Sequence, residues 1–446
     1  MLTYPTITEY LNAIQEDSCF KSLNVNFLRN QNNELIYFVG HDSLVLKVSI
    51  NDSICSLKLY TSHNSHRETY FCHLKRHRKN TQNVYIPKFL YLNSEIRVYI
   101  DGKYQSYPTL VTQWIDGKTL NESIKELTYL GQKGQLYDLT NKFIDFSKKL
   151  IQSEITHLDL KPENIICTET SELQLIDIDA IYLPDYKPEI ISEQGTVWYR
   201  HPLRKAYTYE KYLHDYPILV ILVSLLTVEI KPEMYALYTN DENLLFSPLS
   251  ILKNKDKAYN IVKELFKNTI YNDIVNSLDS KSVKNHNLEK FITIIHYIRF
   301  KSFANKIDNF ILDHFDEYIT INDSMFGIKY ANLWSFVSIN GDMVTPFVYS
   351  KINRASEDKI VVLKDNLWHI YTLNFTLVSS FEAEDATFFS QGLIAIRRSG
   401  KWGYIDENCK TIIDFKYDSA KRFKTNMKAT VNENGTIKEI NKFSKI

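Results

Sequence analysis

The chain has 446 residues, and 44% of them are hydrophobic, which is enough for sizeable cores and, at roughly 100–200 residues per domain, for two to four domains. Lys plus Arg and Asp plus Glu both number 53, so the net charge is zero; this excludes an acidic tail protein and a chain that binds polyanions through overall charge. The five cysteines are widely spaced without a CxxC pair, which argues against a disulfide framework or zinc site and for a reducing compartment.

The N-terminal residues lack the basic start and apolar core of a signal peptide. The longest apolar run, residues 216–228, is shorter than the ~20 residues needed to span a bilayer and predicts a buried helix. We therefore expect a cytoplasmic protein that binds neither membrane nor nucleic acid.

Taken in chain order, the first third of the sequence alternates between strand and helix patterns. Residues 6–23 predict a short helix capped by Thr6 or Thr8. Strand-like runs follow, with Asn51-Asp52-Ser53 as a hairpin turn signal between the last two, at 35–39, 44–50 and 54–60. Residues 64–78 predict a helix, and residues 84–115 return to strands around a tight turn at Asp101-Gly102.

From residue 118 to about 315 the pattern is mostly helical, so a strand-rich segment of about 100 residues precedes a helix-rich segment of about 200.

The C-terminal part of the sequence repeats with a period of 34 residues. Trp334, Trp368 and Trp402 keep this spacing, and three further columns share the register: Asn340, Asn374 and Asn408; Val344, Val378 and Ile412; Phe347, Phe381 and Phe415. Columns in one register predict a repeat array. Short runs such as IVVL (360–363), LIAIRR (393–398) and TIIDF (411–415) predict strands, with the asparagines in turns. Residues 429–440 predict a truncated fourth unit with Thr436 in the tryptophan column.

The residues that carry chemistry lie in the middle of the chain. Residues 157–164 read HLDLKPEN, and Asp177 follows thirteen residues after Asn164. Phosphoryl transfer from a nucleotide needs a carboxylate at the attacking hydroxyl, metal ligands at the phosphates, and a cation. Mg²⁺ prefers oxygen ligands and keeps some waters, so one carboxylate and one amide oxygen suffice. Asp159 would supply the base, and Asn164 and Asp177 would supply the metal ligands.

The string HLDLKPENII, followed by LIDID, resembles the catalytic loop and metal-binding segment of eukaryotic-type protein kinases. The resemblance implies a two-lobed fold in which Lys58, on the third strand, fixes the phosphates of ATP. It implies that Glu68, on the next helix, pairs with Lys58. Lys161 matches the Ser/Thr-specific members of the family and would steady the γ-phosphate. Asp215 resembles the buried aspartate that anchors the catalytic loop.

Residues 110–117 (LVTQWIDG) resemble the hinge that binds adenine. The resemblance makes Thr112 the gatekeeper and puts the backbone of Gln113 and Trp114, as far as Ile115, on the base.

The sequence departs from the kinase pattern at the glycine-rich loop, where residues 39–44 (VGHDSL) offer only Gly40. Cradling of phosphates by the backbone is therefore expected to be weaker. Asp179 replaces the glycine that follows the metal-binding aspartate; it is either a third metal-side carboxylate or a capping residue, and we favour the cap. His157 is expected to pack rather than act as a base, because the resemblance gives that role to Asp159.

Residues 392–417, with Trp402-Gly403 at their centre, resemble one full WG repeat, and Ser335 and His369 replace the glycine in earlier copies. The whole chain is similar to bacterial kinases fused to WG repeats. The resemblance implies an α+β protein with four parts: an N-terminal helical extension (1–30), a β-rich kinase N-lobe (31–117), a helical C-lobe (118–318) and a small all-β WG-repeat domain (322–446).

The expected function is transfer of the γ-phosphate of ATP, with Mg²⁺, to Ser/Thr hydroxyls of a protein substrate, and the repeats would recruit that substrate or a protein partner. Two alternatives stay open. The poor glycine loop is compatible with a nucleotide-binding pseudokinase that acts as a scaffold. A kinase-fold enzyme could also act on a non-protein acceptor or transfer the nucleotide itself, and Lys161 counts against this.

Overall fold

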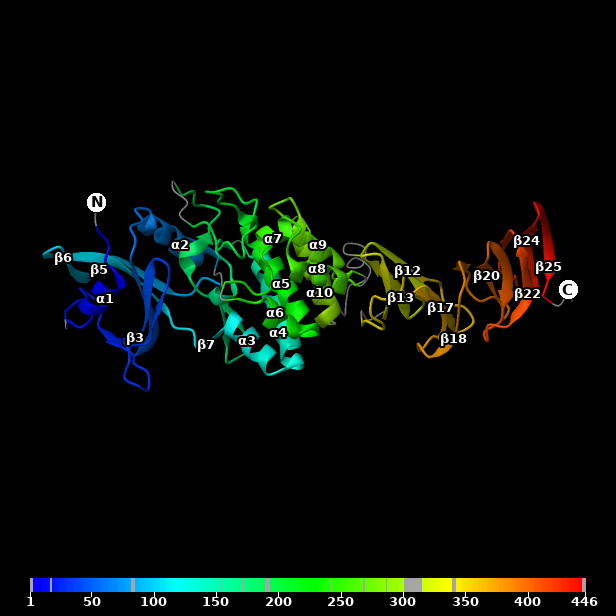
Figure 1. Cartoon of the computed structure of the whole chain (residues 1–446), viewed down its shortest axis with the longest axis horizontal. Coiled ribbons are helices and arrows are strands. Elements are labelled where there is room, and N and C mark those ends of the chain that lie inside the picture. The colour runs from blue at the N-terminus through cyan, green and yellow to red at the C-terminus, as the bar shows by residue number, and fades with distance from the viewer. Residues whose placement is uncertain are drawn as a thin grey trace. The chain divides into compact units, whose positions relative to one another are not determined.

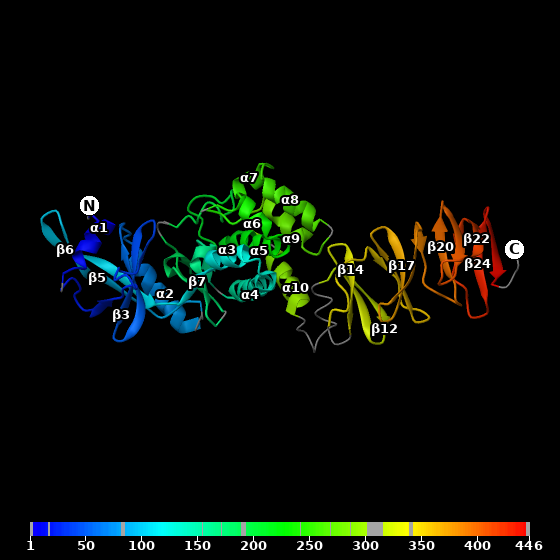
Figure 2. The ribbon, with the colours of Figure 1, turned by 60° about the horizontal axis from the view of Figure 1, so that its bottom comes forward.

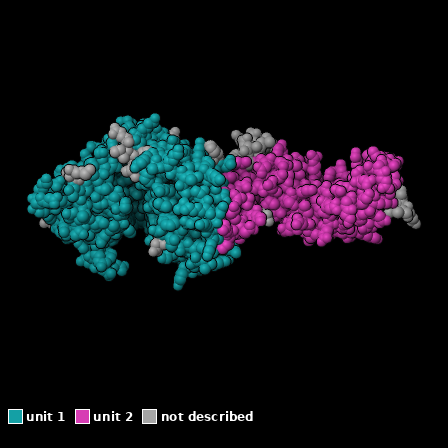
Figure 3. Space-filling model, turned by 45° about the horizontal axis from the view of Figure 1, so that its top comes forward, with its two compact units in different colours: residues 1–259, 277–289 teal, residues 260–276, 290–446 magenta. Residues whose placement is uncertain are grey.

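The computed structural model describes residues 3–16, 18–81, 85–153, 155–170, 172–188, 193–240, 242–267, 269–285, 287–300, 315–338 and 342–442. The chain forms two compact units, one of residues 1–259 with 277–289 and one of residues 260–276 with 290–446 (Figure 3). The first unit combines an N-terminal sheet with helices, and the second ends in an all-β region. The fold is therefore α+β, as the sequence predicts.

The N-terminal sheet is antiparallel and six-stranded, in the order β1-β3-β4-β6-β5, with β2 also paired to β3. Both predicted hairpin turns are present: Asn51 and Asp52 have φ of 48° and 61°, and Asp101 and Gly102 have φ of 51° and 80°. Such positive φ values suit two-residue hairpins. The strands are β1 (Val25–Phe27), β2 (Tyr37–Val39), β3 (Ser43–Ile50), β4 (Ser53–Tyr60), β5 (Phe89–Ile100) and β6 (Lys103–Gln113).

The first thirty residues belong to the core of this sheet. Helix α1 (Ile7–Ala13) begins with a capping box, in which the Thr6 hydroxyl accepts the Glu9 amide and the Glu9 carboxylate accepts the Thr6 amide. The helix is shorter than the predicted 6–23, because the chain then turns to the sheet and adds β1 beside β3. Tyr10 is fully buried, and its hydroxyl donates to the carbonyl of Tyr60 at 2.7 Å.

The alternation of side chains along β4 decides which residues face away from α1. Leu57 and Leu59 are fully buried in the cluster that contains Tyr10 of α1. Lys58 lies between them in sequence, so it points to the opposite face of the sheet. Helix α2 (Arg67–Thr81) packs beside β5 in the first part of the chain (Figures 1 and 2). The contact is made by Phe71, whose ring stacks on that of Tyr91 at 4.7 Å.

The helical part of the first unit is organised around α5 (Asp215–Ile230), in which 14 residues are buried. Of the described residues, one helical stretch, Lys211–Ile230, is long and apolar enough to cross a membrane by length and composition, but 89% of its apolar window is buried inside the protein. The predicted buried helix over residues 216–228 is therefore confirmed.

The other helices are α3 (Leu120–Tyr129), α4 (Lys133–Gln152), α6 (Glu233–Tyr238), α7 (Pro248–Leu252), α8 (Lys257–Phe266), α9 (Asn272–Asn276), α10 (Leu288–Phe300) and the 3₁₀ turns η1 (Pro162–Asn164), η2 (Ile178–Ala180), η3 (Lys211–His214) and η4 (Ser277–Asp279). Short strands lie among them: β7 (Gly117–Thr119), β8 (Thr156–His157), β9 (Ile165–Thr168), β10 (Leu173–Leu175) and β11 (Ile181–Tyr182).

In the second unit, α10 packs against the start of the β region. The rings of Tyr297 and Phe315 lie 5.8 Å apart, and Lys290 pairs with Asp316 at 3.9 Å. The predicted boundary at 318–322 falls inside β12, and the division between the units lies earlier in the chain.

Where the structure describes it, the β region consists of four successive antiparallel sheets. They contain β12 (Glu317–Asn322), β13 (Met325–Tyr330) and β14 (Leu333–Ser338); β15 (Lys351–Ile352), β16 (Lys359–Lys364), β17 (Leu367–Thr372) and β18 (Leu377–Phe381); β19 (Asp385–Ala386), β20 (Ile394–Arg398), β21 (Lys401–Ile405) and β22 (Thr411–Tyr417); and β23 (Ser419–Ala420), β24 (Lys428–Glu433) and β25 (Thr436–Asn441).

Each core cluster of this region joins residues from consecutive sheets, as expected for a repeat array. Trp368 is buried and lies parallel to the Phe381 ring at 6.5 Å, and both pack with Ile394 and Ile405 of the next sheet. The predicted strand runs lie in β16, β20 and β22, and the predicted partial fourth unit forms the hairpin of β24 and β25. Asn374 and Asn408 lie in turns, whereas Asn340 lies outside the described residues.

The residue directly after the repeat tryptophan is Gly403 in one repeat and Ser335 or His369 in the earlier ones, and its surroundings differ accordingly. A Cβ on Gly403 would lie 2.7 Å from the Ile413 carbonyl oxygen, so the neighbouring strand leaves no room for a side chain there. In the earlier copies a polar side chain bonds across to the corresponding segment of the chain instead. The Ser335 hydroxyl donates to the Thr345 carbonyl, and Nδ1 of His369 lies 2.8 Å from the Ser380 hydroxyl.

Candidate active site

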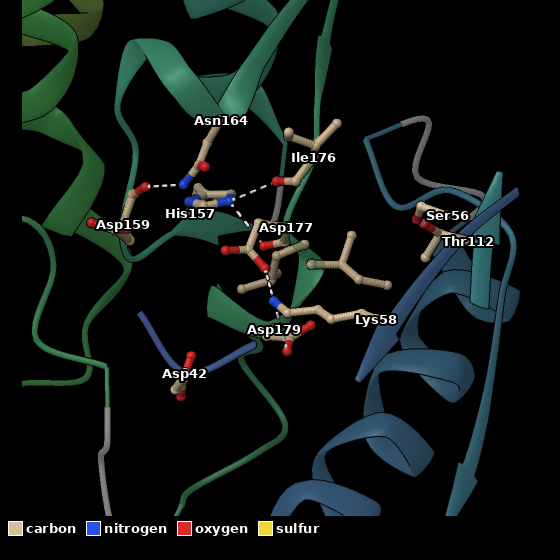
Figure 4. Close-up of polar contacts among 12 residues, drawn as sticks. Asp42, Ser56, Lys58, Thr112, His157, Asp159, Asn164, Ile176, Asp177 and Asp179 are labelled. Atoms are coloured by element: carbon tan, nitrogen blue, oxygen red, sulfur yellow. Dashed lines mark hydrogen bonds and ion pairs between the residues drawn. The ribbon is translucent and has the colours of Figure 1, made fainter. Parts of the chain in front are cut away.

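Two strands hold the segment that contains Asp159. Strand β8 pairs with β11 through His157 and Ile181, and the Leu158 amide donates to the Ala180 carbonyl at 2.6 Å. The buried Nε2 of His157 lies 3.1 Å from the carbonyl oxygens of both Ile176 and Asp177, so this nitrogen carries the proton and donates (Figure 4). His157 therefore joins two backbone segments and is a structural residue, as predicted.

Asp159 uses both of its carboxylate oxygens. Oδ1 accepts the Thr196 amide at 2.5 Å, and Oδ2 lies 3.0 Å from Nζ of Lys161. Nζ of Lys161 also donates to the Thr196 hydroxyl at 3.2 Å. Burial acts to raise the pKa of Asp159, but the Lys161 charge and these hydrogen bonds hold it below its ordinary value. Asp159 is thus an ionised carboxylate at neutral pH.

Asn164 links the Asp159 segment to the Asp177 segment. Its side chain is buried, and Nδ2 donates to the Asp159 carbonyl at 2.8 Å, which orients the amide. Its own carbonyl accepts the Ile176 amide at 3.0 Å. Asp177, which follows Ile176, has φ of 61° and ψ of 64°. This left-handed conformation is costly for a residue other than glycine, and such residues cluster at functional sites.

Lys58 and Asp177, which are 119 positions apart in the sequence, are in contact. Nζ of Lys58 lies 2.5 Å from Oδ1 of Asp177 and 3.1 Å from Oδ2 of Asp179 (Figure 4). Burial acts to lower the pKa of Lys58, but the two carboxylates raise it above its ordinary value. For Asp177, burial acts to raise the pKa and the Lys58 charge lowers it, with a net fall. The three side chains therefore form a charged cluster.

The expected pair of Lys58 and Glu68 is not formed among the described residues. Glu68 is exposed and accepts Nδ2 of Asn93 at 2.7 Å. Its neighbour Arg67 takes the inner face of α2 instead, where it is 7% exposed and its guanidinium lies 3.7 Å from the centre of the Tyr60 ring. Successive helix residues are about 100° apart, so a helix that buries Arg67 turns Glu68 outward.

Asp179 is not a cap. It lies within η2, whose N-cap residue is Asp177, and no side-chain capping bond is present there. Burial and the charge of Asp177 raise the pKa of Asp179 above its ordinary value. The favoured reading of Asp179 as a capping residue is therefore wrong, and its contact is the ion pair with Lys58.

The predicted hinge is the end of β6 and the residues after it. The Thr112 hydroxyl lies 2.6 Å from that of Ser56 on β4, opposite it in the ladder. Gln113 is exposed and ends the strand. The Trp114 amide already donates to the Ile54 carbonyl at 3.2 Å, so it is not free for a base. Its indole packs 6.0 Å from the Phe38 ring.

The loop that contains Gly40 is a tight hairpin between β2 and β3. The Gly40 amide donates to the Ser43 carbonyl at 2.8 Å, which leaves His41 and Asp42 at the tip. The tip is attached to the segment before α2, because the Asp42 carbonyl accepts the Thr61 amide at 2.8 Å and its carboxylate accepts the Ser62 hydroxyl at 3.1 Å. The single-glycine loop therefore forms no glycine-rich cradle.

The donor set fits a magnesium ion only together with a ligand. The described residues contain no cluster of three or more His, Cys, Asp or Glu side chains placed to hold a metal. The oriented Asn164 amide and the ionised Asp177 carboxylate supply oxygen ligands, and Mg²⁺ takes its remaining ligands from water and substrate phosphates. The cluster of Asp159, Asp177 and Asp179 has one more negative charge than Lys58 and Lys161 neutralise when all are ionised, which favours a cation.

Two contacts of the site were not predicted from the sequence. The Thr196 amide reaches Asp159, and the Tyr70 hydroxyl donates to the Ile178 carbonyl at 2.7 Å and accepts the Ile181 amide at 3.0 Å. Tyr70 lies four residues before the buried Leu74, and this helical spacing was the available signal for its position on the inner face of α2.

Comparison with known proteins gives two findings. A family model for the WG containing repeat matches residues 334–368 and 402–436. Over 128 residues the chain is 27% identical to a protein of Encephalitozoon cuniculi (strain GB-M1) named "Probable cell division protein kinase"; the alignment covers 27% of this chain and 45% of that protein. The chain thus spans less than half the length of this relative. The C-terminal β region therefore contains WG repeats, over the residues that the family model matches.

Proposed function

We propose that the chain is an ATP-dependent protein kinase that transfers the γ-phosphate to Ser or Thr hydroxyls of a protein substrate. The observation that carries the proposal is the meeting of Lys58 with Asp177, next to an oriented Asn164 and an ionised Asp159 that is paired with Lys161. The name of the partial relative supports the same class of enzyme.

We assign each residue a role that suits its charge and its contacts. Lys58 is a cation for the nucleotide phosphates, and Lys161 offsets charge on the γ-phosphate. Asn164 and Asp177 would hold Mg²⁺, which when bound neutralises charge on the phosphates. Asp159 would orient the attacking hydroxyl and accept its proton. The WG repeats would recruit the substrate or a protein partner.

The test compares two labels on the full chain in Mg²⁺ with a panel of protein substrates. Label should transfer from γ-labelled ATP and not from α-labelled ATP. Asp159→Asn should lower the rate by roughly 10²–10⁴-fold, the usual contribution of a general base, and leave nucleotide affinity largely unchanged. Full activity of Asp159→Asn would refute the proposal, and transfer of α-label would indicate nucleotide transfer instead.

One observation favours a second candidate, a nucleotide-binding pseudokinase that acts as a scaffold. The hairpin at Gly40 carries the acidic Asp42 at its tip and is bonded to Thr61 and Ser62, so it supplies no glycine-rich cradle for phosphates. Thermal stabilisation of the chain by Mg²⁺-ATP, without transfer of label to any protein, would support this candidate over the enzyme.

A further inference from the structure

The lysine that faces the nucleotide site is held by two carboxylates from one short segment. We propose that Asp179 is the positioning residue for Lys58, in the place where a carboxylate of helix α2 was expected. This inference rests on the proposed function, because it assigns a role in orienting the phosphate-binding lysine. The contacts that carry it are the 3.1 Å pair of Lys58 with Asp179 and the outward position of Glu68 on Asn93.

The local backbone brings the two carboxylates to the same side. Asp177 is left-handed and begins the 3₁₀ turn η2, in which Ile178 and Ala180 are 2% and 3% exposed. Ile178 and Ala180 are buried in the core, whereas the carboxylates of Asp177 and Asp179 both contact Lys58 (Figure 4). A glycine in place of Asp179 would leave Lys58 with Asp177 as its only carboxylate partner among the described residues.

Helix α2 contributes to this arrangement through Tyr70. The Tyr70 hydroxyl donates to the Ile178 carbonyl and accepts the Ile181 amide, at 2.7 and 3.0 Å. These bonds enclose Asp179 on both sides. The helix therefore fixes the segment that presents the carboxylate and does not present a carboxylate of its own.

The two aspartates have different tasks in the proposed reaction. Asp177 is the proposed magnesium ligand, and a metal ion would draw its oxygens away from Lys58. Asp179 keeps a carboxylate on Lys58 when that happens. In protein kinases a lysine–glutamate pair to a mobile helix gives control over activity. Here the pair is formed within the nucleotide site, so holding Lys58 does not require Glu68 to swing inward.

A double-mutant cycle tests this role. The affinity of the full chain for a fluorescent ATP analogue in Mg²⁺ is measured for Asp179→Asn, Lys58→Met and the double variant. If Asp179 acts through Lys58, Asp179→Asn weakens binding by roughly 3- to 100-fold in the parent and by less than about 2-fold beside Lys58→Met. Asp179→Glu should recover part of the loss. Asp138→Asn, on the exposed face of α4, is the matched control.

The same cycle is measured on unfolding of the nucleotide-free chain in urea. The effect of Asp179→Asn on the unfolding constant should differ by roughly 3-fold or more between the parent and the Lys58→Met variant. Equal effects of Asp179→Asn with and without Lys58, or a loss of affinity in Glu68→Gln as large as that in Asp179→Asn, would overturn the inference. A chain that binds nucleotide and shows the coupling but transfers no phosphate would refute the proposed kinase activity alone.

Discussion

Replacing Tyr70 by phenylalanine distinguishes two roles of helix α2: packing through the ring of Tyr70, and hydrogen bonding that fixes the segment around Asp179. The change removes one oxygen and keeps the ring, which contacts Phe71 and Tyr186 at centroid distances of 5.3 and 5.8 Å. The lost hydroxyl leaves the Ile178 carbonyl and the Ile181 amide without these partners. Leaving such groups unsatisfied costs about 1–3 kcal/mol.

Two measurements read this out. Calorimetry on the full chain should show the transition of the first unit fall by a few degrees, because ~1 kcal/mol corresponds to ~2–4 °C in a domain of about 150–250 residues. Affinity for the ATP analogue in Mg²⁺ should fall as well, since η2 is no longer fixed and Asp179 holds Lys58 less well. Tyr129→Phe removes the same group at a position that is 90% exposed and should change neither quantity.

The two readouts can refute different parts of the reasoning. An unchanged transition would mean that water replaces the hydroxyl, so that the bonds of Tyr70 add nothing net. A lower transition with unchanged nucleotide affinity would leave Tyr70 as a stabilising residue and would break the link from α2 through η2 to Lys58.

Three further predictions concern buried groups. Burial raises the pKa of Asp215 to about 7, so between pH 5 and 8 the folded chain gives up this proton later than the unfolded chain and stability falls as pH rises. In urea titrations the free energy of unfolding of Asp215→Asn should therefore rise by roughly 2–3 kcal/mol relative to that of the parent between pH 5 and pH 8. A difference between the two proteins that does not change with pH would contradict the raised pKa of Asp215. Gly403→Ala should lower the transition of the second unit by about 1–3 kcal/mol, because its Cβ would meet the Ile413 carbonyl at 2.7 Å; an unchanged transition would show that the strand yields. Ser335→Ala should cost about 1 kcal/mol by the same measurement, since it removes a buried hydroxyl from the Thr345 carbonyl, and no loss would mean that this bond is neutral.

Strands and their turns could be predicted where local chemistry decides them. Residues 44–50 and 54–60 alternate clearly and form Ser43–Ile50 and Ser53–Tyr60, because a hairpin with Asn51 and Asp52 at positive φ fixes their register. The 34-residue columns likewise predict the repeats, because each copy has to bury the same face against the next.

Elements that depend on distant partners could not be predicted in the same way. Helix α1 stops at Ala13 because the following residues reach the sheet, where Phe20 bridges to Ile96 and Val25–Phe27 pair with β3. Nothing in the local sequence of β1 specifies that partner.

The same distinction applies to the candidate site, where some contacts are local in sequence and others depend on distant elements. Asp159, Lys161 and Asn164 lie within six residues, so their contacts with one another follow from one loop. The partner of Lys58 depends instead on the rotation of α2 about its axis, which the buried Phe71 and Leu74 set. The helical period of the buried residues predicts this rotation, which places Arg67 on the buried face of α2 and Glu68 on the exposed face.

The charge of the site suggests how a nucleotide could be bound next to a loop that contains one glycine. A glycine-rich loop binds phosphates through backbone amides and needs no net charge. Here the hairpin tip offers Asp42 instead, and three aspartates lie beyond it with two lysines. A triphosphate would be repelled by this set unless a cation came with it. On the proposed function, Mg²⁺ at Asn164 and Asp177 therefore supplies attraction that the loop does not, and Asp179 keeps Lys58 aimed at the phosphates while Asp177 is engaged by the metal.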